Sequence, residues 1–517
     1  MEASIKVSHP DLPHLPDLPT QVIASSGEER MDVRSPFDGK KIGEVPVSSN
    51  EDVEAAFARA RIAQEVWAKV PLEQRRKVAA RFGKLVLENR KRLLDLLQLE
   101  TGKARSAAFE EVVDLPLWSG YVYHNAFAHL APRKRRGALP VLTQTVERRV
   151  PHGVVGIITP WNYPLTLPGT DSLPALAAGN AVVLKPDSLT PLTGIAIANL
   201  LRKAGVPRDV LQVVIGPGSR VGELLTDLAD FITFTGSTRT GERIAEKCAG
   251  RLVGFAAELG GKNPLLVLDD ADVERAAFGA TQACFANAGQ LCISIERIYV
   301  TEKHWDQFLS AFRRNVEQLR LNSGFSWKTD VGSLASAPQL EKVSSHVEDA
   351  RKKGASVEIG GRPRPDIGPY FYEPTILTGV TPDMEVFAHE TFGPVTSVYK
   401  VATDEDALTA ANDSGYGLNA SVWSRSGGRE VANQIQAGTV NVNDGYGAAW
   451  ASYGSPMGGM KLSGIGRRHG VPGLQKYTQA QTVAVQHVVP VSGPRWLSHK
   501  SWSRVLTVGA KVMRHLP

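Results

Sequence analysis

One cysteine of this 517-residue chain stands apart from the other two. Cys292 follows Gly289 in the stretch FANAGQLCIS, beyond a predicted helix that begins near Asp272 and ends near that glycine. Cys284 lies on the apolar stripe of this helix and Cys248 on another helix, so both are expected in the core. A free thiol has a pKa of about 8.5 and needs an electropositive setting to act as a nucleophile. A buried structural cysteine is the alternative for Cys292.

Two further side chains could support a reaction at a carbonyl carbon. Glu258 follows an apolar stretch in AAELGGKNP, and a carboxylate in apolar surroundings has a raised pKa and can act as a general base. Asn162 lies in the rigid loop TPWNYP, where its amide could donate to a developing oxyanion. The alternatives are a glutamate satisfied by backbone amides and an asparagine in an Asx turn.

Short apolar strands that alternate with helices place these groups at strand ends. From Val154 onward the strands are GVVGIITP, AVVLKP, VLQVVIGPG and FITFTGS, and helical stretches such as PLTGIAIANLLRKAGVP separate them. This pattern predicts an α/β fold with a parallel sheet and right-handed crossovers, which binds ligands at the carboxyl ends of its strands. A second αβ series runs from about Pro264 to Gly464.

Two glycine turns in the first series could hold a pyrophosphate. FTGSTRTG places Gly236 and Ser237 where a strand becomes a helix, and GPGSRVG offers Gly218 and Gly222. Free amides and the helix dipole suit a phosphate at such turns, although neither turn matches G-x-G-x-x-G and both could simply end strands. The chain has no P-loop and no H-E-x-x-H motif, and no metal site is expected.

Seven motifs in a fixed order now indicate a family. They are P-W-N (160–162), L-K-P (184–186), F-T-G-S-T-x-x-G (234–241), E-L-G-G-K-N (258–263), F-x-N-x-G-Q-x-C (285–292), E-T-F-G-P-V (390–395) and M-G-G-x-K-x-S-G-x-G-R (457–467). From about residue 30 to 485 the chain resembles the aldehyde dehydrogenase superfamily, with a pattern similar to bacterial NADP-dependent succinate-semialdehyde dehydrogenases. The resemblance implies a Rossmann-like cofactor domain, an αβ catalytic domain and a small oligomerisation hairpin.

The resemblance also implies roles for individual residues. Cys292 matches the nucleophile, Glu258 the base that activates the deacylating water, and Asn162 the oxyanion donor. The implied cofactor-binding residues are Ile158, Thr159, Trp161, Asn162, Lys185, Ser188, Gly218, Gly222, Phe234, Gly236, Ser237, Leu259, Glu390 and Phe392. The expected reaction oxidises an aldehyde to a carboxylic acid through a thioester, with hydrolysis favoured over transfer to coenzyme A.

The expected cofactor is NADP, with NAD as the alternative. Ser188 lies three residues after the lysine of L-K-P, where NAD-preferring relatives commonly carry an acid, and a hydroxyl accepts a 2′-phosphate that a carboxylate would repel. The neighbouring Asp187 complicates this prediction. Succinic semialdehyde is the expected substrate, yet Thr170 and Ala286 replace arginines that hold the carboxylate in well-known members, and Asp171 would repel an acid.

Three other interpretations of the function stay open. Tyr446, Trp450 and Tyr453 would suit an apolar or aromatic aldehyde if they lie at the pocket mouth, and otherwise they pack on the surface. A long-chain aldehyde dehydrogenase at a membrane surface is also conceivable, because the tail carries an apolar helical face opposite basic residues. That face comprises Trp502, Val505, Leu506, Val512, Met513 and Leu516. Docking of the tail onto its own oligomer is the favoured alternative, and a catalytically silent protein on the same fold is the third hypothesis.

Charge and cysteine content limit the partners. The sequence pI is about 9.0, but the stretch after Gln481 has no acidic residue and carries five of the net +6 charges, so no nucleic-acid partner is expected. Three cysteines form no disulfide framework, no apolar run reaches about 18 residues, and no signal peptide is recognised. We expect a cytoplasmic homodimer or homotetramer that takes a small-molecule aldehyde.

The predicted domains follow these boundaries. They are an N-terminal arm (1–34), a cofactor-binding domain (35–137 and 153–263), a catalytic domain (264–465), oligomerisation strands (138–152 and 478–490) and a basic amphipathic tail (491–517). The prolines of HPDLPHLPDLP favour an extended arm, either poorly ordered or docked on a neighbour. LPVLTQTVERRV (139–150) predicts a polar strand pair at an edge or between subunits.

Overall fold

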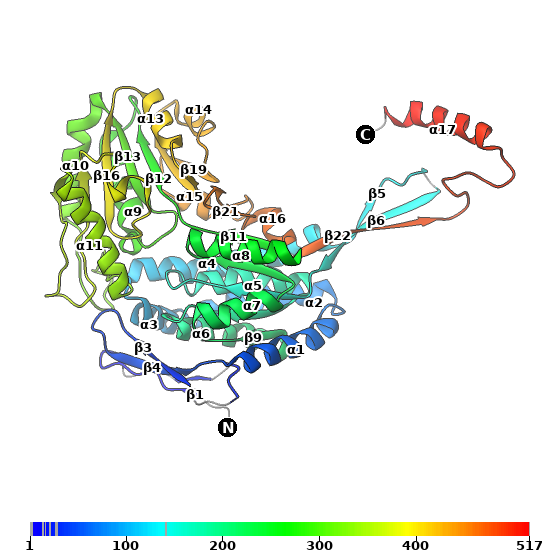
Figure 1. The fold of residues 1–517 in the computed structure, drawn as a ribbon, viewed down its shortest axis with the longest axis horizontal. Coiled ribbons are helices and arrows are strands. Elements are labelled where there is room, and N and C mark those ends of the chain that lie inside the picture. The colour runs from blue at the N-terminus through cyan, green and yellow to red at the C-terminus, as the bar shows by residue number, and fades with distance from the viewer. Residues whose placement is uncertain are drawn as a thin grey trace.

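The computed structural model describes residues 4–12, 15, 17–19, 22–25, 29–139 and 142–515. Two αβ bodies lie against each other, and a narrow antiparallel sheet carries the C-terminal helix away from them (Figure 1). The predicted α/β class is confirmed. Within the described part of the chain, no helix is long and apolar enough to cross a membrane.

The first body is built on a six-stranded sheet of the predicted kind. Its order is β21-β11-β10-β7-β8-β9, and all pairs are parallel except that of β21 with β11. The strands are β7 (Val154–Ile158), β8 (Ala181–Lys185), β9 (Leu211–Val213), β10 (Phe231–Thr235), β11 (Gly254–Glu258) and β21 (Gly464–Ile465). Helices cover both faces, so β7, β8, β9 and β10 are buried along almost their whole length instead of alternating between buried and exposed residues.

The helices of this body have these bounds: α1 (Asn50–Trp67), α2 (Leu72–Glu88), α3 (Arg90–Thr101), α4 (Arg105–Leu130), α5 (Thr166–Ala178), α6 (Pro191–Lys203), α7 (Glu223–Leu228), α8 (Thr238–Arg251) and α16 (Gly470–Gln475). Helix α5 is buried along its whole length and packs against α4, which makes it the central support of the Asn162 loop. Glu111 of α4 accepts the backbone N–H groups of Leu165 and Thr166 at 2.9 and 3.0 Å, and thereby satisfies the start of α5.

The second body contains a seven-stranded sheet of order β14-β15-β16-β13-β12-β18-β19, in which β14 alone is antiparallel to its neighbour. The strands are β12 (Asn263–Val267), β13 (Ile295–Thr301), β14 (Ser356–Ile359), β15 (Thr375–Thr378), β16 (Val395–Val401), β18 (Asn419–Trp423) and β19 (Thr439–Val442). Its main helices are α9 (Val273–Phe285), α10 (Trp305–Glu317), α11 (Ala337–Lys352), α13 (Asp404–Asn412) and α15 (Gly447–Trp450).

Two predicted domain boundaries need correction. The predicted catalytic domain extends to residue 465, but β21 pairs with β11 and therefore belongs to the first sheet. The chain returns to the first sheet at β21 before it continues into β22. The cofactor domain was drawn to residue 137, yet β5 (Arg133–Arg135) pairs with β6 (Thr143–Pro151) in the projecting sheet.

The N-terminal arm is extended, as its prolines predict, over the residues that the structure describes. Strands β1 (Ser4–Ile5) and β2 (Leu18–Pro19) pair, and Ile5, Val7 and Leu18 are buried in the core of the first body. The described part of the arm therefore packs on its own subunit and is not a poorly ordered tail there, and contact with a neighbour stays a prediction; residues 13, 14 and 16 of the proline stretch lie outside the described part. The limit at residue 34 also cuts a hairpin of β3 (Arg30–Arg34) and β4 (Lys41–Pro46).

The polar segment at 139–150 forms one strand and not a strand pair. Strand β6 pairs along its length with β22 (Thr478–Gln486), and residues 140 and 141 lie outside the described part. Strand β22 is largely exposed. Beyond it, α17 (His499–Met513) confirms the predicted helix, capped by Ser498 and placed away from both bodies (Figure 1). Its Val505 and Val512 are exposed, Leu516 lies outside the described residues, and docking of this face stays a prediction.

Candidate active site

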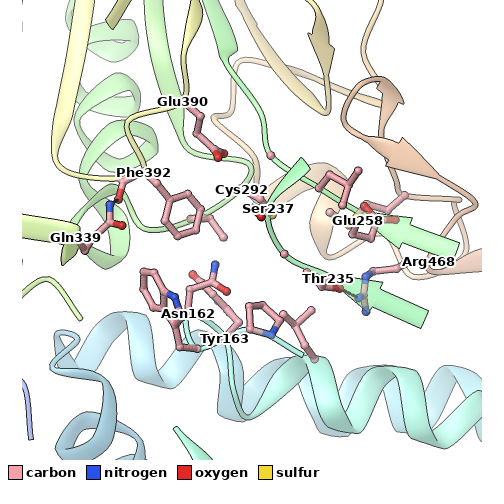
Figure 2. Close-up of a pocket in the computed structure, with 18 of the residues that line it drawn as sticks. Asn162, Tyr163, Thr235, Ser237, Glu258, Cys292, Gln339, Glu390, Phe392 and Arg468 are labelled. Carbon is pink, nitrogen blue, oxygen red and sulfur yellow. Dashed lines mark hydrogen bonds between the residues drawn. The ribbon is translucent and has the colours of Figure 1, made fainter. Parts of the chain in front are cut away.

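A cavity of about 950 Å³ lies between the two bodies and brings the predicted catalytic residues together. Cys292, Asn162 and Glu258 all line it. In Figure 2, Phe392, Glu390 and Gln339 lie on one side of Cys292, and Glu258 and Arg468 lie on the other. The cavity therefore has two ends that meet at the thiol.

Cys292 owes its position to a sharp end of helix α9. After Phe285 the chain enters a left-handed kink, with φ of 50° at Asn287 and 54° at Ala288, so the backbone turns toward the cavity. Asn263 donates to the Cys292 carbonyl at 2.8 Å and fixes the turn. Burial raises the pKa of the Cys292 thiol to about 12, and the carboxylates of Glu258 and Glu390 add to the shift. The thiol is thus protonated until a positive charge enters the cavity or a base accepts its proton.

The other two cysteines are core residues, as predicted. Cys248 and Cys284 are both 2% exposed, and burial raises the pKa of Cys248 to about 11 and that of Cys284 to about 12. Neither lines the catalytic cavity.

Asn162 is held by the backbone of the nucleophile turn and not by an Asx turn. Its side-chain amide donates to the Gln290 carbonyl at 3.1 Å, which leaves a second N–H of the same group for a ligand. The backbone carbonyl of Asn162 accepts a hydrogen bond from the buried ammonium of Lys103 at 2.6 Å. Lys103 also pairs with Glu111. The Asn162 loop is therefore clamped from both the α4 and the Cys292 sides.

Glu258 ends strand β11 inside the cavity. It is 6% exposed, and burial raises its pKa to about 7, against the lowering effect of Arg468 and Lys476. At Gly458 a Cβ atom would come within 2.8 Å of the Glu258 carboxylate, at a backbone φ of +154°, so only glycine leaves room there. A carboxyl group with this pKa is about half ionised near neutral pH and is suited to general base catalysis.

Arg468 is the site residue that sequence reasoning missed. It is 5% exposed, and its guanidinium donates to Asp171 at 2.9 Å, to Thr235 at 2.6 Å and to Thr170 at 3.3 Å. Asp171 also lies 3.5 Å from the ammonium of Lys476. The expectation that Asp171 repels an acid is therefore wrong, because cations neutralise it. The sequence does contain a signal for such a cation, because an aspartate inside the apolar segment TLPGTDSLPALAA requires a buried positive partner.

Thr170 and Ala286 do not line the cavity. The guanidinium of Arg468 contacts Thr170 instead, so a cation stands close to one of the two positions where an arginine was expected. Tyr446, Trp450 and Tyr453 line a second cavity that adjoins the first, as expected for a pocket mouth and not for surface packing.

The predicted cofactor residues fall into two groups. One group lines the catalytic cavity and comprises Trp161, Asn162, Gly236, Ser237, Leu259, Glu390 and Phe392. Ser237 caps α8, the rings of Trp161 and Phe392 meet edge to face at 5.5 Å, and Glu390 accepts the N–H of Gly261 at 2.8 Å. Of this group, Glu390 and Phe392 lie at the end of the cavity opposite Arg468 (Figure 2).

The other group lies at neighbouring strand ends outside that lining. It comprises Ile158, Thr159, Lys185, Ser188, Gly218, Gly222 and Phe234. Gly222 lies beside the Lys185 side chain, and Phe234 packs beneath Gly236. The Ser188 hydroxyl donates to the Gly216 carbonyl at 3.1 Å. Asp187 lies near enough to Lys185 for the ammonium to lower its pKa, although burial raises that pKa overall.

A nucleotide fits this edge of the sheet. Lys185 is 4% exposed, and its ammonium makes a single long bond, 3.4 Å to the Pro186 carbonyl, among the bonds of the described residues. The buried Thr159 hydroxyl has no hydrogen-bond partner there. Ribose hydroxyls or a phosphate would supply hydrogen-bond partners for both groups. The described residues contain no cluster of His, Cys, Asp and Glu that could hold a metal ion.

Known proteins share this arrangement. The aldehyde dehydrogenase family matches residues 22–483. A protein of Mycolicibacterium smegmatis, provisionally named succinate-semialdehyde dehydrogenase using NADP(+), is 52% identical over 483 residues, or 93% of each chain. The betaine aldehyde dehydrogenase of Bacillus subtilis is 36% identical over 89% of this chain and 95% of its own.

Among solved structures, betaine aldehyde dehydrogenase from Staphylococcus aureus in complex with NAD+ has a TM-score of 0.86 and 33% identity, and covers 92% of this chain and 95% of its own. The resemblance read from the seven motifs is confirmed, and the chain belongs to the aldehyde dehydrogenase family.

Proposed function

We propose that this protein oxidises an aldehyde to a free carboxylic acid with a nicotinamide dinucleotide, through a thioester on Cys292. The convergence of Cys292, Asn162 and Glu258 on one cavity is the observation that supports this most directly. Retention of all three groups argues against a catalytically silent protein. A nicotinamide bound beside Glu390 and Phe392 would supply the hydride acceptor, and residues of the chain carry out the other steps of the reaction.

The first half-reaction builds the thioester. The Cys292 sulfur attacks the aldehyde carbon and gives up its proton, which Glu258 can accept because burial raises its pKa to about 7. The spare N–H of Asn162 donates to the new oxyanion. The tetrahedral carbon then loses its hydrogen with both electrons as hydride and becomes the thioester.

The second half-reaction removes the acyl group. Glu258 first releases the thiol proton to solvent; the carboxylate then takes a proton from water, and the resulting hydroxide attacks the thioester carbon. The carbon–sulfur bond breaks, the acid leaves, and the sulfur takes up a proton again. The carboxylate of Glu258 lies in a buried position next to Arg468, which keeps an ionised form accessible near neutral pH.

NADP is the proposed cofactor. The named mycobacterial relative supports it, as does the hydroxyl side chain at Ser188 in place of an acid. Two contacts count against a strong preference for NADP: the Asp187 carboxylate lies beside Lys185, and the Ser188 hydroxyl donates to Gly216. The solved relative with NAD+ keeps NAD as the alternative. We also propose, as from the sequence, a cytoplasmic homodimer or homotetramer assembled through the β6–β22 sheet.

Succinic semialdehyde is the first candidate substrate, because the named relatives support it. The cations that line the catalytic cavity are Lys342 and Arg468, and Arg468 already pairs with Asp171. A second candidate, an aldehyde without a carboxylate, is favoured by the adjoining cavity, whose lining carries Glu110 and Asp114 and no lysine or arginine.

Steady-state reduction of NADP+ and NAD+ with succinic semialdehyde, hexanal and benzaldehyde tests the proposed function, with Cys292→Ala as control. Turnover of at least one aldehyde that disappears in the variant supports the reaction. Absence of both turnover and acyl transfer to Cys292 with every aldehyde and both cofactors would revive the catalytically silent protein.

A further inference from the structure

A second cavity of about 650 Å³ extends the catalytic cavity outward. Tyr163, Leu291 and Trp450 line both cavities, so the two adjoin at these side chains. Helix α4 forms one wall of this outer cavity, and the segment from Tyr446 to Tyr453 forms the other. An aldehyde that reaches Cys292 along this path leaves its far end in the outer cavity.

Two carboxyl groups face the outer cavity from one side of α4. Glu110 and Asp114 are four residues apart, so they lie on the same helix face. Glu110 accepts hydrogen bonds from the hydroxyls of Tyr163 at 3.2 Å and Tyr446 at 3.2 Å. Asp114 is 2% exposed and accepts from Tyr453 at 2.8 Å through one oxygen.

The second oxygen of Asp114 is buried and lacks a hydrogen-bond partner among the described residues. The Trp450 and Thr166 side chains lie near enough to lower its pKa, but burial dominates and raises it to about 7. Burial also raises the pKa of Glu110. Among the described residues neither carboxyl group forms an ion pair, although the nearby Lys103 ammonium partly counters the rise in the pKa of Glu110.

The cation that acts on Glu110, Lys103, is already engaged. Lys103 lies 2.5 Å from Glu111, donates to the Asn162 carbonyl, and sits 4.3 Å from the centre of the Tyr163 ring. On the far side, Arg468 and Lys476 pair with Asp171, and burial lowers the pKa of the neighbouring His469 to about 3. No charged group of the described lining offsets Glu110 and Asp114.

Aromatic side chains complete the lining. Tyr163, Tyr446, Trp450 and Tyr453 surround the two carboxyl groups. Aromatic faces attract cations, including ammonium groups without a proton to donate, and the attraction is strongest in desolvated sites. Carboxylates and aromatic rings together select a positive charge and reject a negative one.

We propose that the outer cavity binds the far end of the substrate and that this end is cationic, so the enzyme acts on an aldehyde with an ammonium group several bonds from its carbonyl. The proposal rests on the proposed function and adds the substrate class to it. A bound cation would ionise Asp114 and Glu110, and its attraction to both would offset the cost of their burial.

Three aldehydes of similar size test this class. 4-(Trimethylammonio)butanal carries the charge, 5,5-dimethylhexanal replaces its nitrogen by carbon, and succinic semialdehyde carries the opposite charge. We expect kcat/KM for the ammonium aldehyde to exceed that for its carbon isostere by about tenfold or more, and succinic semialdehyde to be the poorest of the three.

Two variants assign the effect to the outer cavity. Asp114→Asn and Glu110→Gln keep the shape of each side chain and remove its charge, so each should lower the ratio of kcat/KM for the ammonium aldehyde to that for the isostere by about tenfold. Glu65→Gln, on the exposed face of α1, removes the same charge elsewhere and should leave the ratio unchanged. Binding of 4-(trimethylammonio)butan-1-ol to Cys292→Ala, followed by calorimetry, reports the same preference without turnover.

Equal kcat/KM for the ammonium aldehyde and its isostere, or an equal loss for both in Asp114→Asn, would overturn the proposal. Preference for succinic semialdehyde would overturn it too, while the proposed oxidation stands. Absence of turnover with these aldehydes and with hexanal and benzaldehyde, together with calorimetric binding of the cationic alcohol, would instead reject the proposed function and keep the cation site.

Discussion

The inner and outer cavities of the substrate path are built in different ways. In the inner cavity the reactive groups stand at strand ends and turns and are tied to backbone atoms: Asn162 to the Gln290 carbonyl, and the Cys292 turn to Asn263. In the outer cavity, side chains bond to side chains between α4 and the segment after β19, as Tyr453 does to Asp114. A hydrogen bond to a backbone atom changes position only if the fold changes, whereas a hydrogen bond between two side chains can be removed by one substitution.

The difference teaches that the chemistry and the choice of substrate are separable in this protein. Changes in the inner cavity should affect every aldehyde alike. Changes in the outer cavity should alter the ratio between aldehydes and spare the shared chemistry. The predictions below test this separation, beginning with the largest effect.

Cys292→Ala should abolish oxidation of every aldehyde, with a loss of roughly 10⁴-fold in kcat or more, because no other described group can form the thioester. Reduction of NADP+ followed by absorbance measures it. Cys248→Ala, which removes a buried thiol far from the cavity, is the matched control and should retain most of the activity. Residual turnover above about one per cent would assign the nucleophile elsewhere.

Glu258→Gln should lower steady-state turnover by about 10²–10³-fold for all aldehydes, because deacylation loses its base. In the unchanged protein the base must be ionised, and burial raises the pKa of Glu258 to about 7. Turnover should therefore fall as pH decreases through about 7 and level off above it. A flat profile between pH 6 and 8, with deacylation rate-limiting, would exclude Glu258 as the base.

Lys103→Met should destabilise the fold by about 3 kcal/mol, because it leaves the buried Glu111 carboxylate unpaired. It also removes the bond to the Asn162 carbonyl, so kcat should fall by about tenfold for every aldehyde alike. Urea denaturation and steady-state kinetics measure the two effects. Lys84→Met, at an exposed lysine of α2, is the control. A change confined to one aldehyde would place Lys103 in the outer cavity.

Removal of residues 491–517 should change kcat and KM by less than about twofold, since α17 lies away from both cavities. Sedimentation of full-length and shortened protein, alone and with anionic liposomes, distinguishes the roles of the tail. A lower oligomer size after shortening supports docking on the oligomer. Liposome binding that disappears after shortening would favour the membrane surface instead.

The sequence predicted the sheet and the inner cavity well because both are encoded locally. Apolar strands such as Ala181–Lys185 bounded by turns identify a parallel sheet, and Gly289 marks the turn that separates α9 from Cys292. Motifs at strand ends then place Asn162 and Glu258 at one edge.

What the sequence could not provide depends on contacts between distant segments. Glu110 and Tyr446 are 336 positions apart, and no local pattern pairs them. Arg468 reaches Asp171 across 297 positions. The docking of the N-terminal arm on its own subunit likewise depends on where Ile5 and Leu18 find an apolar surface. The spacing of residues along the sequence does not predict such contacts.

The most direct test of the account is the intact mass of Glu258→Gln after mixing with NADP+ and an aldehyde that the unchanged protein oxidises. The account predicts a single acyl adduct on Cys292, formed together with about one equivalent of reduced cofactor and released slowly. Reduced cofactor without an adduct, or an adduct on another residue, would contradict covalent catalysis at Cys292.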